Sequence, residues 1–101
     1  MTSVNSINDI QFILDERQKQ YGHYTDVAST SQALKEVICV GENYFELPFY
    51  AKESLDMIAS KVARIVNGDW KHKDSWKDIA GYAQLVLDVL EDSREASIKG
   101  E

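Results

Sequence analysis

Four carboxylate side chains in the second half of the sequence have spacings that could bring them together: Glu53 with Asp56, and Asp74 with Asp78. Residues three or four positions apart share one face of a helix, so each pair can converge. Asp78 also aligns with Tyr82 along an otherwise apolar stripe, where a carboxylate is costly unless it is paired or binds a metal ion. Because Mg²⁺ prefers oxygen ligands, the four acids form a candidate magnesium site.

Each pair of acids also has a purely structural explanation. Asp74 suits the N-cap of a helix. Asp78 suits the third position of a capping box with Ser75, where the helix dipole favours its charge. Glu53 and Asp56 can lie on a solvated helix face opposite the core. From the sequence alone, the structural and the metal-binding interpretations both stay open.

Two basic residues follow the first acidic pair on the same predicted helix. Lys61 and Arg64 come one and two turns after Asp56. Carboxylates at one end of a helix and cations further along suit a site that holds Mg²⁺ and the phosphate groups it bridges. We therefore predict that Lys61 and Arg64 bind phosphate.

The elements that carry these residues are predicted to be four amphipathic helices. Apolar residues recur with helical periodicity in four stretches, and Gly22, Gly41 and Gly68 separate them. The predicted helices span roughly residues 7–20, 27–40, 48–67 and 74–94. The last one is apolar on nearly every side, so we expect it to be the most buried.

Length and composition place these helices in one domain. The 101 residues are 44% hydrophobic and 28% charged, which predicts a single all-α, four-helix bundle-like domain over residues 1–101. We expect oligomerisation to complete its core, and residues 1–5 and 96–101 to fray. The net charge of −6 argues against extensive nucleic-acid binding.

The chain has no apolar run of membrane-spanning length, so no membrane contact is expected. The single cysteine, Cys39, excludes an intramolecular disulfide and is expected to be a buried free thiol. The absence of a disulfide framework favours a reducing, cytoplasmic setting.

Much of the chain resembles a family of small phage and prophage proteins of uncharacterised function. The resemblance covers roughly residues 16–87. The motifs that carry it are Tyr21-Gly22-His23-Tyr24 with Asp26, Gln32-Ala33-Leu34, Glu53-Ser-Leu-Asp56 with Lys61 and Arg64, Gly68-Asp69, and Trp76-Lys-Asp78-Ile-Ala-Gly-Tyr82.

More distantly, the pattern resembles the MazG-type all-α nucleoside triphosphate pyrophosphohydrolases. Those enzymes carry Glu-x-x-Glu on one helix and Glu-x-x-Asp on the next. Glu53 and Asp56 match the first pair, with Asp in place of the second Glu, and Asp78 matches the final Asp. Ser75 stands where the pattern has its remaining acid.

The resemblance implies a Mg²⁺-dependent hydrolysis of NTPs or dNTPs to monophosphates and pyrophosphate. Glu53, Asp56 and Asp78 would then be catalytic, and Asp74 would join them as a metal ligand. The resemblance also implies a homodimer or a higher oligomer. Ring-bearing side chains of the first turn and of a later loop would bind the base: Tyr21, His23, Tyr24 and Trp70.

In a second hypothesis, the same helical bundle has no catalytic activity. In this case the acidic phage protein binds and inhibits a host factor for defence or nucleic-acid handling. A third hypothesis is a structural dimerisation module without a ligand. The role of the loop around Lys71-His72-Lys73 is also undecided from the sequence. Trp70 and Trp76 either contact phosphate or a partner, or hold the loop against the bundle.

Overall fold

A computed structural model describes the backbone of residues 2–100 and the side chains of residues 9–92. This part of the chain contains four α-helices, one short 3-10 helix and no strand, which confirms the all-α prediction. The elements are α1 (Thr2–Tyr21), α2 (Tyr24–Cys39), η1 (Tyr44–Glu46), α3 (Phe49–Asn67) and α4 (Lys73–Gly100). The structure contains no helix, within residues 2–100, that is long and apolar enough to span a membrane.

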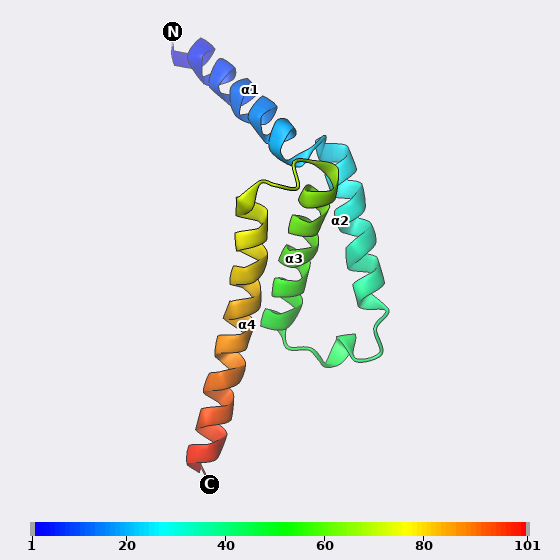
Figure 1. Ribbon diagram of the computed structural model, residues 1–101, viewed down its shortest axis with the longest axis vertical. Helices are drawn as coiled ribbons and strands as arrows, with labels where there is room; N and C mark the ends of the chain where they lie inside the picture. Colours follow the sequence, from blue (N-terminus) through cyan, green and yellow to red (C-terminus); the bar gives the residue numbers. More distant parts are fainter. Residues whose placement is uncertain (1, 101) are drawn as a thin grey trace.

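Three of the helices form a flat layer. α2, α3 and α4 run in alternating directions, and α3 lies between the other two and packs against both (Figure 1). α1 meets this layer at its C-terminal end and projects away from it (Figure 1). The Cα radius of gyration is therefore 18.1 Å, compared with about 13 Å for a compact domain of this length.

Two glycines join α1 to the layer. Gly22 has a φ of +93°, and a Cβ atom there would lie 2.2 Å from the carbonyl oxygen of Asn67. A Cβ atom on Gly68 would lie 2.3 Å from the carbonyl carbon of Tyr21. The backbone amide of Asp69 donates to Gln20 O at 2.8 Å. The turn after α1 and the loop after α3 are thus in direct backbone contact.

The fully buried part of the layer is small and rich in small side chains. Among the residues whose side chains are described, Ala59 and Ala63 are the buried apolar ones. Ser31 of α2 is also buried, and its hydroxyl lies 3.2 Å from that of Ser60 on α3. Small residues let the helices approach closely, but they bury little apolar area.

Two expectations about burial are wrong. α4 is not the most buried helix, because Leu85, Leu87 and Leu90 are 59%, 45% and 55% exposed. The thiol of Cys39 is exposed as well. α4 has apolar residues on several faces, but only one of these faces packs against α3. The predicted fraying at the chain ends falls on side chains outside the described residues and stays a prediction.

Candidate functional site

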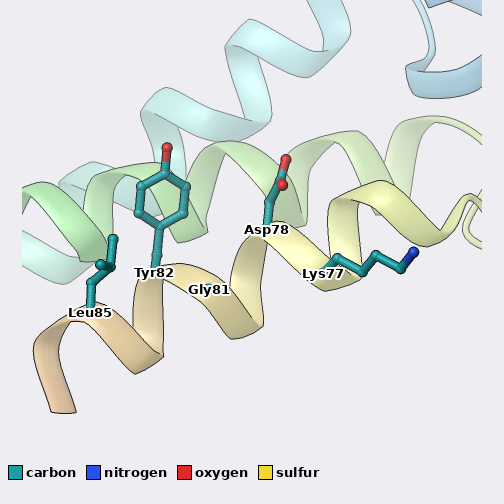
Figure 2. A pocket seen from close by; sticks show the side chains of 5 residues that line it. All are labelled: Lys77, Asp78, Gly81, Tyr82 and Leu85. Atoms are coloured by element: carbon teal, nitrogen blue, oxygen red, sulfur yellow. The ribbon is translucent and has the colours of Figure 1, made fainter. Parts of the chain in front are cut away.

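Asp78 points from α4 towards α3 (Figure 2). Its Oδ2 lies 3.1 Å from the Nζ of Lys61. The Lys61 side chain is only 11% exposed, whereas the Asp78 side chain is 47% exposed. Because a buried ammonium group is costly without a counter-charge, this ion pair is a structural reason for a carboxylate in the apolar stripe. The Asp78 carboxylate nevertheless remains accessible from solvent.

An open pocket of about 410 Å³ runs along this side of α4 (Figure 2). Asp78, Tyr82 and Leu85 line it, together with Lys77 and Gly81. A Cβ atom on Gly81 would meet nothing within 4 Å. All the lining residues belong to α4, so one helix forms the wall and the opposite side is open.

A second hollow, which we call the cation–aromatic groove, lies where α1, α2 and α3 meet. Its volume is about 540 Å³. The guanidinium carbon of Arg64 lies 4.5 Å from the centroid of the Tyr21 ring. Arg17, Asp15 and Tyr24 also line the groove. Two predicted substrate-binding residues, Tyr21 and Tyr24, thus meet a predicted phosphate-binding residue here.

Tyr21 also connects the groove to the loop after α3. The His72 ring packs edge-on against Tyr21, with 5.5 Å between the ring centroids. His72 Nε2 lies 3.5 Å from Asp74 Oδ2 but makes no hydrogen bond. This chain of contacts connects Arg64 and Tyr21 to His72 and Asp74, at the end of the layer where α4 begins.

Glu53 and Asp56 lie further towards the start of α3. They precede Lys61 by eight and five residues, which corresponds to about 12 and 8 Å along the helix axis. A hydrogen bond with the Cys39 side chain raises the pKa of the Tyr44 phenol, and the Asp56 carboxylate adds to this effect. Asp56 is therefore near the loop that joins α2 to α3.

The predicted metal ligands are thus spread along the layer. Within the part of the chain whose side chains are described, no group of three or more His, Cys, Asp or Glu residues could hold a metal ion. Glu53 and Asp56 are on α3, Asp78 is beside Lys61, and Asp74 is beside His72. A magnesium site that uses fewer protein ligands stays a prediction.

The remaining predicted substrate-binding residues lie at the surface. Trp70 is 60% exposed, and Lys71 Nζ lies 5.7 Å from its ring centroid. Trp76 Nε1 donates a hydrogen bond of 2.7 Å to the carbonyl oxygen of Trp70, so Trp76 ties the loop to α4. His23 is the exposed N-cap residue of α2, and its side chain makes no capping hydrogen bond.

Arg17 and Asp15 are groove residues that the sequence analysis missed. The prediction of a helix over residues 7–20 rests on its apolar periodicity and not on its polar residues. Arg17 precedes Tyr21 by four residues, and this spacing places both on one helix face. The sequence could therefore have predicted that Arg17 lies beside Tyr21.

The helices and grooves define a small, elongated all-α protein with a cationic and aromatic hollow at one end. A protein-family model described as Domain of unknown function (DUF6378) matches residues 8–90. The chain therefore belongs to this family. The chain matches no curated protein and no solved structure.

Proposed function

We propose that this protein binds nucleoside triphosphates as a homo-oligomer and hydrolyses them to monophosphates and pyrophosphate. The observation that carries the proposal is a pair of contacts made by successive turns of α3: Lys61 with Asp78, and Arg64 with the Tyr21 ring. The MazG-type resemblance supports the same reaction, and the phage-protein resemblance supports a setting in the cytoplasm of a bacterial host.

The cation–aromatic groove supports the binding step. Arg17 and Arg64 bring two guanidinium groups into one hollow of a chain whose net charge is −6. Guanidinium groups bind phosphate oxygens in a bidentate geometry. The Tyr24 ring is 83% exposed and therefore free to stack on a base. A ligand with phosphates at one end and a planar base at the other matches these groups.

Mg²⁺ fits this arrangement as an ion that arrives with the nucleotide. Mg²⁺ keeps several water ligands and is commonly bound by one or two carboxylates plus substrate phosphates, so it needs no cluster of three acids. The carboxylates that would hold it are those of one pair, either Glu53 and Asp56 on α3 or Asp74 and Asp78 on α4. The ion supplies polarisation of the phosphate and a more acidic bound water.

The homo-oligomer in the proposal is supported by the exposed apolar side chains. They occur on α1 and on α4, and include Ile10, Phe12 and Leu14 at 58%, 65% and 53% exposure. A monomer that exposes this many large apolar side chains is a candidate for association.

The test of the reaction is release of pyrophosphate from a panel of NTPs and dNTPs in the presence of Mg²⁺. We expect release to match the formation of monophosphate. Glu53→Gln should lower it, because it removes a predicted Mg²⁺ ligand at an exposed position, where the change should leave the fold intact. Glu36→Gln is the matched control, an exposed glutamate on α2. No release from any nucleotide, with no shift in Tm on adding Mg²⁺, would contradict the hydrolysis.

The acidic charge and the exposed apolar faces favour a second candidate function, which is inhibition of a host factor by direct binding. This function predicts a stable complex with a host protein that survives Glu53→Gln and weakens when several surface acids are neutralised together. Pyrophosphate release without such a complex would exclude it as the main activity.

A further inference from the structure

α4 carries an apolar stripe that packs against no other helix in the described part of the chain; its first member, Trp76, hydrogen-bonds the backbone of Trp70. We call it the outer stripe, and its members are Trp76, Ala80, Ala83, Leu87 and Leu90. All five are exposed, and Trp76, Leu87 and Leu90 are 51%, 45% and 55% exposed. At about 100° per residue, the outer stripe lies roughly opposite Asp78 and Leu85 on the helix.

The spacing of the outer stripe is that of a helix-pairing seam. Successive members are four, three, four and three residues apart. This repeat keeps one side of a helix in contact with a second helix over its length, as in a two-stranded coiled coil. α3 is not the helix that covers the outer stripe. It packs against another side of α4, which includes the buried Ser75 and the half-buried Ile79 and Val86.

The accessible surface area of the chain is large enough to include a subunit interface. It amounts to 7825 Å², compared with about 5,800 Å² for a compact monomer of this size. The excess is about 2,000 Å². A stable dimer needs roughly 800 Å² from each partner. A second copy can therefore cover the outer stripe and further apolar surface.

We infer that α4 pairs with α4 of a second copy in antiparallel orientation, about a two-fold axis beside Ala83. In this register Trp76 lies opposite Leu90 of the second copy, and Ala80 lies opposite its Leu87. Ala83 lies opposite Ala83, where small side chains allow the closest approach of the two helices. Large residues thus face small ones on both sides of the axis.

The charges beside the outer stripe select the antiparallel orientation. Lys73 and Lys77 lie on one flank near the start of α4, and Asp88 and Glu91 lie on the same flank further along. All four side chains are exposed. Antiparallel pairing sets this flank against the same flank of the second copy, so that Lys77 lies close to its Asp88. Parallel pairing instead sets this flank against the opposite one, which carries Ile79 and Val86.

This pairing leaves the pocket beside Asp78 open, because that pocket lies on the opposite side of α4. The inference specifies the oligomer of the proposed function. Its test measures dimer formation and not nucleotide hydrolysis. The proposed dimer and the proposed hydrolysis can therefore be refuted independently of each other.

The test is a cysteine cross-link in the full-length chain carrying Cys39→Ser, since Cys39 is exposed and would otherwise react. We expect Ala83→Cys to give a disulfide-linked dimer on mild oxidation, because symmetric pairing brings the two thiols together. Ser29→Cys is the matched control, an exposed position on α2 far from the outer stripe.

We expect Ala83→Cys to cross-link at least about ten times faster than Ser29→Cys, and light scattering to give the mass of two chains for the unmodified protein. Equal cross-linking rates for the two variants would overturn the inference. A single-chain mass across micromolar to millimolar concentrations would overturn it as well.

Discussion

Two sides of α4 are both apolar in sequence, yet they differ in how the structure uses them. On the pocket side, Asp78 is paired with Lys61 of α3, and Tyr82 and Leu85 follow it along an open hollow. On the outer stripe, Leu87 and Leu90 are about half exposed and face no other helix of the described chain. One side is organised by contacts within the chain, and the other is the side for which we propose contacts between chains.

The difference shows that the charge on the pocket side belongs to the fold as well as to the candidate site. Lys61 is buried because Asp78 is near it, and the pair connects α3 to α4. The outer stripe has no such polar link, so its area is free to contribute to association. A substitution on one side should therefore change a different measurable property from the same substitution on the other.

The largest expected effect is that of Leu87→Glu on the assembly. A carboxylate in the centre of the apolar seam is desolvated in both copies, which should raise the Kd of the dimer at least about 100-fold. Analytical ultracentrifugation measures this change. Leu85→Glu is the matched control, since Leu85 is 59% exposed on the pocket side. A dimer weakened equally by both changes would show that the two sides do not differ.

Sequence periodicity was sufficient to predict the four helices, because Gly22, Gly41 and Gly68 interrupt four clear apolar repeats. It could not tell which apolar face a neighbouring helix covers. The repeat of α4 is compatible with packing inside the chain or against another chain, so the helix was wrongly expected to be the most buried. The exposure of Cys39 was missed for the same reason.

The sequence predicted which residues belong to the candidate site, but not which of them contact one another. The Lys61–Asp78 contact depends on the register between α3 and α4, which no spacing along one helix reveals. Likewise, the contact of Arg64 with Tyr21 depends on the close approach of the Gly22 and Gly68 backbones. Both contacts join different helices, so predicting them needs this three-dimensional information.

The next expected effect is that of Asp78→Asn on stability. It leaves the buried ammonium of Lys61 without a counter-charge, but Asp78 is half exposed, so we expect a loss of about 1–2 kcal/mol instead of the 3–5 kcal/mol of a fully buried pair. The Tm should fall by roughly 5–10 °C at a fixed protein concentration.

Two further variants separate the ion pair from other effects of Asp78→Asn. The double variant Lys61→Met with Asp78→Asn should regain most of the lost stability, because it removes the unpaired charge. Glu36→Gln, at an exposed position on α2, should leave the Tm within about 2 °C of the wild type. A wild-type Tm for Asp78→Asn alone would mean that the pair does not stabilise the fold.

The effect of Arg64→Ala on nucleotide binding is expected to be of similar size. Loss of one charged, bidentate phosphate contact should raise the Kd for a triphosphate about tenfold. Arg64→Lys should give an intermediate value, since it keeps the charge but loses the fork geometry. Isothermal titration calorimetry measures both, with Lys19→Ala on α1 as the control outside the groove. Unchanged binding in Arg64→Ala would place the phosphates elsewhere.

The smallest expected effect comes from the charges beside the outer stripe. Lys77→Glu brings like charges together at both ends of the antiparallel pair and should raise the Kd of the dimer about three- to tenfold at low salt. Adding Asp88→Lys should restore the wild-type Kd, because it exchanges the two signs within the same contact. In a parallel dimer this charged flank would face the opposite flank of the partner helix, which carries Ile79 and Val86, so Lys77→Glu would change the Kd little and Asp88→Lys would bring no recovery. Measuring both variants at low and high salt therefore reports the orientation of α4 directly, since screening should remove the difference between them.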